Sequence, residues 1–261
     1  YRELEVVNAA NTQHLETYKS FLYNRLQRKG SDSKDIHRLA ARDRHVFAAL
    51  MLAHGHGDGL VTGATRKSAH VLERLNHVFD ANAKHGAVGI TALLHKGRIV
   101  FIGDTLVHEW PNEEDLANIA EKGAKVARHM GLEPRVAFVS FSTFGYPVSE
   151  RAEKMQRAPD VLDARGVDFE YEGEMTVDVA LNAESQKNYP FSRLTGPANI
   201  LVVPARHSAS ISVKLMQEMA GATVIGPILT GLDKSIQICS TTSTANDILN
   251  MAILAACKVG E

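Results

Sequence analysis

The chain has 261 residues, of which 44% are hydrophobic and 23% charged, with a formal net charge of −1 at pH 7. This composition is typical of an ordinary globular protein that can bury a substantial core in one large or two small domains. Because the charge is nearly balanced, we expect no nucleic acid and no membrane as a partner. An anionic ligand must therefore be held by local cations or helix ends.

The two cysteines, Cys239 and Cys257, form neither a CxxC pair nor a disulfide framework. A reducing cytoplasm is the simplest setting for such a chain. The longest apolar runs fall short of a membrane span, and we expect no signal peptide. Because the first residue is Tyr1 rather than methionine, we expect the chain to be a fragment of a longer protein.

The first part of the chain is predicted to be mainly helical. Apolar residues recur at roughly helical spacing over 12–26 and again over 34–54, and the polar run 28–33 interrupts the pattern. The apolar stretch 59–64 then indicates a buried strand or the end of one. A further helix is predicted over 68–82.

Strands and helices alternate through the rest of the chain. The expected strands are 87–95, 97–107, 135–142, 167–175, 199–205, 223–231 and 235–240. The expected helices are 112–131, 149–166, 176–188, 210–221 and 243–260. Near-continuous apolar strands that alternate with helices predict an α/β fold with a mostly parallel sheet.

Four polar stretches follow predicted strands, namely 59–66, 140–146, 204–210 and 239–247. In open α/β sheets, ligands bind beyond the carboxyl ends of the strands. We therefore expect the functional residues to lie in these four stretches.

Residues 54–70 read HGHGDGLVTGATRKSAH and contain three histidines and four glycines. His54, His56 and Asp58 would share a face of an extended segment, as metal ligands could. Glycines separate them, however, and no matching Cys/His pair occurs elsewhere, so we expect no metal site. The glycines also do not form a GxGxxG or Walker pattern, so they specify no phosphate loop by themselves.

Hydroxyl side chains are concentrated in 140–143 and 239–244, and no GxSxG elbow accompanies them. Such residues at strand-to-helix turns suit either phosphate or carbonyl binding or helix capping, and the residues alone leave both open. Asp178 and Asp247 are candidate acid–base groups. An aspartate in a first helical turn also compensates the helix dipole, which is the alternative for Asp247.

Five stretches, taken in order, resemble motifs of the phosphate acetyl/butyryltransferase family: 57–70, 111–143, 171–182, 196–204 and 223–256. The likeness covers roughly residues 20–257. It implies two α/β lobes around a cleft, with one lobe formed by 1–105 plus 240–261 and the other by 106–239. It also implies a dimer, and a chemistry that moves an acyl group between coenzyme A and phosphate.

The chain departs from the family at positions that bear on this chemistry. Ser240 and Asp247 match the serine and aspartate of the family's acyl-phosphate motif, in which the aspartate is proposed to deprotonate coenzyme A. Thr241 stands where the family has an arginine. Phe144 and Ala205 replace a family lysine and a family aspartate. Because a dianionic phosphate needs a fixed bidentate cation, the loss of the arginine disfavours acyl transfer.

Three further parts of the chain resemble the phosphotransacetylase-like domain of hybrid malic enzymes: the entry segment with 22–30 and 42–52, then 141–146, and 204–238. In that family the domain is regarded as regulatory: it binds acetyl-CoA, which inhibits malate decarboxylation, and it helps to build a homo-oligomer. The resemblance implies a catalytically inactive domain without a cofactor of its own. NADP and a divalent metal would bind only in the malic-enzyme domain, outside this chain.

The resemblance also implies an acetyl-CoA site. Its expected residues are Arg66, Ser142, Thr143, Arg206, Lys214, Ser240, Thr241 and Asp247, with Ser240 and Asp247 as vestiges of catalysis. The first alternative is an active phosphate acetyl- or butyryltransferase. The second is a structural oligomerisation module whose cleft binds nothing.

Overall fold

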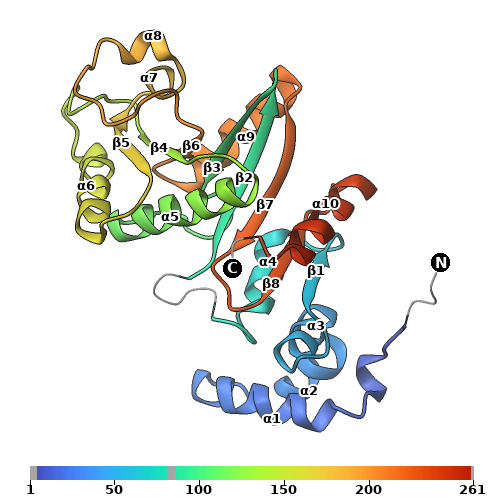
Figure 1. Ribbon diagram of the computed structural model, residues 1–261. Coiled ribbons are helices and arrows are strands. Elements are labelled where there is room, and N and C mark those ends of the chain that lie inside the picture. The colour runs from blue at the N-terminus through green and yellow to red at the C-terminus, as the bar shows by residue number, and fades with distance from the viewer. Residues whose placement is uncertain (1–4, 81–85, 260–261) are drawn as a thin grey trace. The chain divides into compact units, whose positions relative to one another are not determined.

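The computed structural model describes residues 5–80 and 86–259 (Figure 1). The chain divides into two compact units. The first comprises Tyr1–Gly86 and Leu232–Lys258, and the second comprises Ala87–Gly231 and Val259–Glu261. Each unit is described by itself.

The first unit is built on a short parallel sheet of two strands, with helices packed against it. The strands are β1 (Gly59–Gly63) and β8 (Ser235–Cys239). The helices are α1 (Leu15–Leu26), α2 (Ser33–Arg42), α3 (Arg44–Ala53), α4 (Ser68–Leu75) and α10 (Ala245–Ala256), and the 3-10 turns are η1 (Ala9–Asn11) and η2 (Gln27–Lys29).

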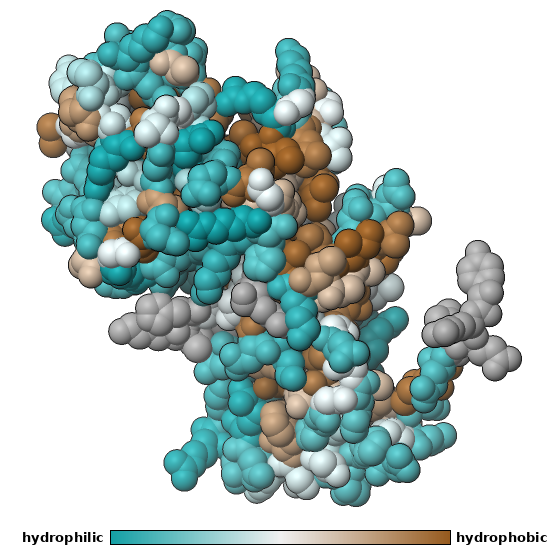
Figure 2. Space-filling model, in the orientation of Figure 1, coloured by the Kyte–Doolittle hydropathy of each residue, from teal (hydrophilic) through white to brown (hydrophobic). Residues whose placement is uncertain are grey.

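The outer side of α10 is apolar. Ile248, Leu249 and Ile253 are 39%, 56% and 51% exposed, and Figure 2 shows the corresponding hydrophobic surface over this helix. The opposite side of α10 is held to the sheet, where the buried Ser235 hydroxyl donates to the Ala255 carbonyl at 2.8 Å.

Asp43 breaks what the sequence indicated as one continuous helix over 34–54. Its backbone is extended, and its Oδ1 accepts hydrogen bonds from the backbone N–H groups of His45 and Val46 at 3.0 and 3.2 Å. This N-cap satisfies donors that the first turn of α3 leaves without intrahelical partners. The chain therefore turns at Asp43, and Arg42 and Arg44 occupy the ends of two different helices.

Gly63 ends β1 where the strand runs against β8. It pairs with Cys239 and has a φ of +108°, a backbone conformation that residues other than glycine rarely adopt. A Cβ at this position would lie 2.2 Å from the Cys239 carbonyl oxygen. The close approach of the two strands therefore depends on glycine here, and it sets the start of the turn that leads to α4.

The second unit contains a six-stranded sheet in the order β5-β4-β6-β3-β2-β7. Its strands are β2 (Val88–His95), β3 (Arg98–Gly103), β4 (Arg135–Val139), β5 (Glu170–Met175), β6 (Ile200–Val202) and β7 (Thr223–Thr230). Its helices are α5 (Glu113–His129), α6 (Glu150–Arg165), α7 (Val177–Leu181), α8 (Ala183–Gln186) and α9 (Arg206–Ala220).

The predicted α/β fold with a mostly parallel sheet is confirmed. Neighbouring strands from β5 to β3 are parallel, as are β1 and β8, whereas β2 is antiparallel to both β3 and β7. Because β2 and β3 pair with strands of the second unit, that unit begins at Ala87 rather than at residue 106. Because β7 pairs with β2, the main segment of this unit extends to Gly231, and it stops there rather than at residue 239.

Several helix boundaries differ from the predicted ones. Helix α9 begins at Arg206, four residues before the predicted start. The predicted helix over 176–188 is two short helices, because Asn182 is extended and caps α8 through a hydrogen bond from the Glu184 N–H at 2.9 Å. Helix α4 ends at Leu75, and the predicted continuation beyond residue 80 lies outside the described residues, as does the predicted end at 260.

Helices cover both faces of the large sheet. Ile119 of α5 lies against Gly103, whereas α7 and α9 pack on the opposite face, which carries Ile102 and Ala137. Trp110, the single tryptophan of the chain, lies outside this core and is 70% exposed. Its ring contacts the imidazole ring of His207, and the ammonium group of Lys154 lies over it. Within residues 5–80 and 86–259, no helix is both long and apolar enough to traverse a bilayer.

We expect Gly63→Ala to destabilise the chain by about 2–4 kcal/mol, because the new methyl group would collide with the backbone of β8 in a strained conformation. Gly57→Ala is the matched control, since the nearest atom to its Cβ is 3.9 Å away. Urea unfolding followed by circular dichroism measures both variants. Equal midpoints for the two variants would contradict the role assigned to Gly63.

Candidate functional site

A cavity of about 510 Å³ opens in the first unit and is lined mainly by cations. Its lining residues are Arg42, Asp43, Arg44, His45, Arg66, His70 and Arg74. We call it the arginine cavity. With four arginines against one aspartate, its wall attracts anions.

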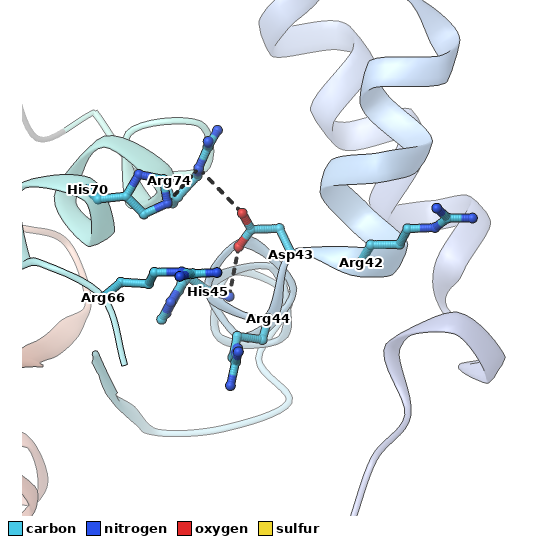
Figure 3. A pocket seen from close by; sticks show the side chains of 7 residues that line it. All are labelled: Arg42, Asp43, Arg44, His45, Arg66, His70 and Arg74. Atoms are coloured by element: carbon cyan, nitrogen blue, oxygen red, sulfur yellow. Dashed lines mark hydrogen bonds and ion pairs between the residues drawn. The ribbon is translucent and has the colours of Figure 1, made fainter. Parts of the chain in front are cut away.

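The local folding of three segments brings these cations together. Arg42 and Arg44 flank the helix break at Asp43, and Arg66 lies in the turn between β1 and α4. His70 and Arg74 are four residues apart on α4 and so lie on the same side of that helix. Figure 3 shows Arg66, His70 and Arg74 gathered near Asp43, with Arg42 directed away from them.

Asp43 also orients one of these cations. Its Oδ2 lies 3.4 Å from Nε of Arg74, while its Oδ1 caps α3. The same Nε of Arg74 donates to Nε2 of His70 at 3.4 Å. The carboxylate is thus committed to α3 and Arg74, and Arg44 and Arg66 remain as cations on the wall of the cavity.

His45 is the most buried of the titratable residues that line the arginine cavity, with 4% of its surface exposed. Its Nδ1 lies 2.7 Å from Oγ1 of Thr62, whereas its buried Nε2 has no hydrogen-bond partner among the described residues. Burial lowers the pKa of His45 below its ordinary value of 6.5; Asp43 opposes this shift, and Arg44, His70 and Arg66 add to it. The ring is therefore neutral at pH 7.

A second cavity of about 290 Å³ shares Arg44 and His45 with the first and is more apolar. Its other lining residues are Val61, Thr62, Gly63, Ala64, Cys239 and Ile248. Cys239 and Ile248 flank the hydroxyl-rich turn 240–247. The second cavity therefore lies beside this turn, in the same unit as the arginine cavity.

Ser240 and Asp247 of this turn are engaged in local hydrogen bonds. Oγ of Ser240 lies 2.9 Å from the hydroxyl of Thr242 and accepts from the Thr242 N–H at 3.1 Å. Asp247 forms a capping box with Thr244: its Oδ2 accepts from the Thr244 N–H at 2.7 Å and from the Thr244 hydroxyl at 2.8 Å. Thr241 is exposed. Helix capping is therefore the role that the geometry gives Asp247.

The other predicted site residues lie in the second unit. Ser142 is fully buried, and its Oγ has no partner among the described residues. Thr143 donates to the Thr176 hydroxyl at 3.2 Å. Arg206 donates to the Leu106 carbonyl at 3.2 Å, and Lys214 is exposed on α9. Ser142 and Thr143 are adjacent in sequence, while Arg206 and Lys214 belong to the same helix.

The structure thus places Arg66 among cations that the sequence did not single out for a site. Arg42, Arg44 and His45 read as the interior of a helix, and only the aspartate between the two arginines could have signalled an N-cap. His54 and His56 belong to an aromatic cluster with Tyr18, whose hydroxyl lies 2.6 Å from Nδ1 of His56. No group of three or more metal-binding side chains occurs within the part of the chain that the structure describes.

Known proteins resemble this chain along most of its length. The family described as phosphate acetyl/butaryl transferase matches residues 1–256. The NADP-dependent malic enzyme of Rhizobium meliloti (strain 1021) is 49% identical over 98% of this chain, which spans 34% of the length of that protein. The phosphate acetyltransferase of Bacillus subtilis (strain 168) is 28% identical over 89% of this chain and 72% of its own length.

Solved structures show the same fold. A phosphotransacetylase from Streptococcus pyogenes superimposes with a TM-score of 0.89 at 24% identity, over 99% of this chain and 79% of that chain. The arrangement of helices and strands in this chain is therefore that of the phosphotransacetylases.

We expect the stability of the chain to fall as the pH decreases below about 6.5, in part because of His45. In the unfolded state an imidazole takes up a proton near its ordinary pKa of 6.5, whereas the buried ring does so only at lower pH. The unfolded state then binds more protons, so the free energy of unfolding decreases as the pH falls. His45→Gln is expected to show a weaker decrease than the parent in urea unfolding between pH 7.5 and 5.5.

His37→Gln serves as the control for this measurement, since His37 is exposed on α2. A pH dependence of His45→Gln that equals that of the parent would show that burial does not perturb this ring.

Proposed function

The chain belongs to the phosphate acetyl/butaryl transferase family, and from this we propose that it is the regulatory, phosphotransacetylase-like part of an NADP-dependent malic enzyme. In this proposal it binds acetyl-CoA as an inhibitory effector and carries out no acyl transfer of its own. The malic-enzyme relative supports the assignment, because it matches this chain over almost its full length. NADP and a divalent metal would bind in the remainder of such an enzyme.

The arginine cavity is the observation that carries this proposal. Coenzyme A bears a diphosphate and a 3′-phosphate, and guanidinium groups bind phosphate oxygens through paired N–H donors. Arg66, predicted from the sequence as a cation for the phosphates of coenzyme A, lines this cavity together with Arg44 and Arg74. The apolar second cavity adjoins it through Arg44 and His45 and could receive a less polar part of the same ligand.

The turn 240–247 supports the absence of acyl transfer. The position that carries an arginine in the active family is the exposed Thr241, so this position supplies no guanidinium to an acyl phosphate. The Asp247 carboxylate accepts two hydrogen bonds from Thr244 and stabilises the start of α10.

The predicted ligands in the second unit stay predictions. Arg206 is oriented by the Leu106 carbonyl, and its Nη2 lies 3.6 Å from a carboxylate oxygen of Glu109. Lys214 is exposed and so can reach an anion in solution. Ser142 is fully buried, so its hydroxyl is not accessible to a ligand in this conformation.

Helix α9 supports the proposed homo-oligomer. Ile211, Leu215 and Met219 are 66%, 58% and 80% exposed, and their spacing of four residues places them on one side of the helix. Lys214 and Glu218 border this stripe one turn apart. In an antiparallel pair of α9 helices, Lys214 of each copy would face Glu218 of the other. We therefore propose that a second copy of this chain covers the apolar stripe of α9.

We expect acetyl-CoA to bind the chain, with release of heat in calorimetry and a higher thermal midpoint, since a ligand of the native state stabilises it. Arg66→Ala is expected to weaken this binding by about tenfold or more, as the loss of a charge-assisted contact does. Lys214→Ala tests the predicted cation of the second unit. Arg28→Ala is the control, because Arg28 is exposed and lies outside the arginine cavity.

The same titration separates the alternatives. Absence of heat and of a thermal shift at millimolar acetyl-CoA would favour a purely structural module. In an assay with acetyl phosphate and coenzyme A, turnover within about a hundredfold of an active phosphotransacetylase would favour the enzyme, since the loss of the arginine contact should cost at least that much.

We expect Leu215→Glu to dissociate the oligomer, because it places a desolvated charge at the centre of the apolar stripe. Light scattering should report the mass of one chain, 28.5 kDa, for this variant and a multiple of it for the parent. Val148→Glu is the control, since Val148 is 90% exposed and lies outside α9. An unchanged mass for Leu215→Glu would place the interface elsewhere.

A further inference from the structure

We propose that His45 is a proton-carrying ligand of the arginine cavity: its Nε2 donates a hydrogen bond to a phosphate oxygen, and occupation of the cavity takes up a proton. The inference rests on the proposed function in naming the phosphate as one of acetyl-CoA. It adds to that function a binding residue and a dependence of effector affinity on pH.

The position of the ring sets up this role. His45 lines both cavities, and its Nδ1 is held at 2.7 Å from the Thr62 hydroxyl, which fixes the direction of Nε2. Nε2 is buried and has no partner within the described part of the chain. Buried polar atoms in native proteins are almost always hydrogen-bonded, so the unpaired Nε2 of a residue that lines both cavities is the atom of this ring that a ligand oxygen would satisfy.

The proton distribution changes when a ligand oxygen arrives. A neutral imidazole has one N–H, which either nitrogen can carry, whereas the imidazolium donates from both. In the imidazolium, Nδ1–H would donate to the Thr62 hydroxyl and Nε2–H to the phosphate. Both polar atoms of the ring are then satisfied, and the positive charge lies next to the anion.

The charges around His45 decide when this proton is bound. Asp43 caps its own helix, α3, and its carboxylate is shared with Arg74. The other groups that face the ring or line its two cavities are Arg42 from the end of α2, Arg44 from α3, Arg66 from the turn after β1, His70 and Arg74 from α4, and Cys239 from β8. Burial lowers the pKa of His45, and the cations, which outnumber the single acid, lower it further. The unliganded ring is therefore neutral at pH 7.

A phosphate dianion in the cavity weakens this positive field. It offsets the guanidinium charges and attracts a proton to His45, so phosphate binding and protonation favour each other. The reciprocal effect is that acidification strengthens binding. For one coupled proton, the limit is a tenfold gain in affinity per pH unit.

Calorimetry with two phosphate ligands tests the inference. Acetyl-CoA and adenosine 3′,5′-bisphosphate are titrated at pH 7.5 and 6.5, each in two buffers of different ionisation enthalpy, so that the number of protons taken up on binding is measured. His45→Gln is the informative variant, because its amide can donate from about the same place as Nε2 but takes up no proton. His37→Gln is the control for the loss of a histidine.

We expect the parent and His37→Gln to take up more protons than His45→Gln with both ligands. The affinity of the parent should also rise several-fold more between pH 7.5 and 6.5 than that of His45→Gln. Since the free ligands titrate identically in all three experiments, a difference in proton uptake arises from the His45 site. Nuclear magnetic resonance of the His45 imidazole in the parent provides a second measurement that needs no variant, and its titration midpoint should rise on binding.

Equal proton uptake by the parent and His45→Gln, or an unchanged midpoint of the His45 resonance, would overturn the inference and leave acetyl-CoA binding intact. Binding of adenosine 3′,5′-bisphosphate with proton uptake, but no binding of acetyl-CoA, would support the role of His45 and overturn the proposed effector. If neither ligand binds, both proposals are wrong.

Discussion

The carboxylate of Asp43 is the constraint on which the arginine cavity depends. It accepts hydrogen bonds from two backbone N–H groups at the start of α3 and lies within ion-pair distance of Arg74. The hydrogen bonds to the backbone end one helix and start the next, so Arg42 and Arg44 point in different directions. The ion pair with Arg74 connects α4 to the start of α3. A single acid thereby organises arginines that would repel one another without it. The cation excess that remains is what makes the cavity a site for anions.

Hydrophobic patterns in the sequence predicted the fold better than single capping residues did. Hydrophobic patterns located the helices and strands well, because α5 buries one side over many residues and the strands β2 and β4 are buried along most of their length. The break at Asp43 and the split of the helix over 176–188 were missed, since each depends on one side chain that bonds to the backbone rather than on a repeated pattern.

The candidate site was accessible from the sequence only in part. Arg66 was nominated because it follows a strand and opens a helix, and it does line the cavity. Arg44 and His45 could not be nominated in this way, because they precede the strand by many residues and join the site only through the packing of α3 on β1. The bond between His45 and Thr62 is a contact of that packing. Ser240 and Asp247 were placed on one turn, but the structure gives them different partners, Thr242 for Ser240 and Thr244 for Asp247.

The exposed Trp110 gives the molecule a built-in optical label. It is the single tryptophan and lies in the second unit, whereas both cavities lie in the first. Tryptophan emission therefore reports on the surroundings of Trp110 in the second unit. A change of emission wavelength or intensity on addition of a ligand shows that these surroundings have changed, whether by direct contact with the ligand or by a change in the second unit. The intrinsic fluorescence of the unmodified chain is thus a readout of the second unit that needs no added label.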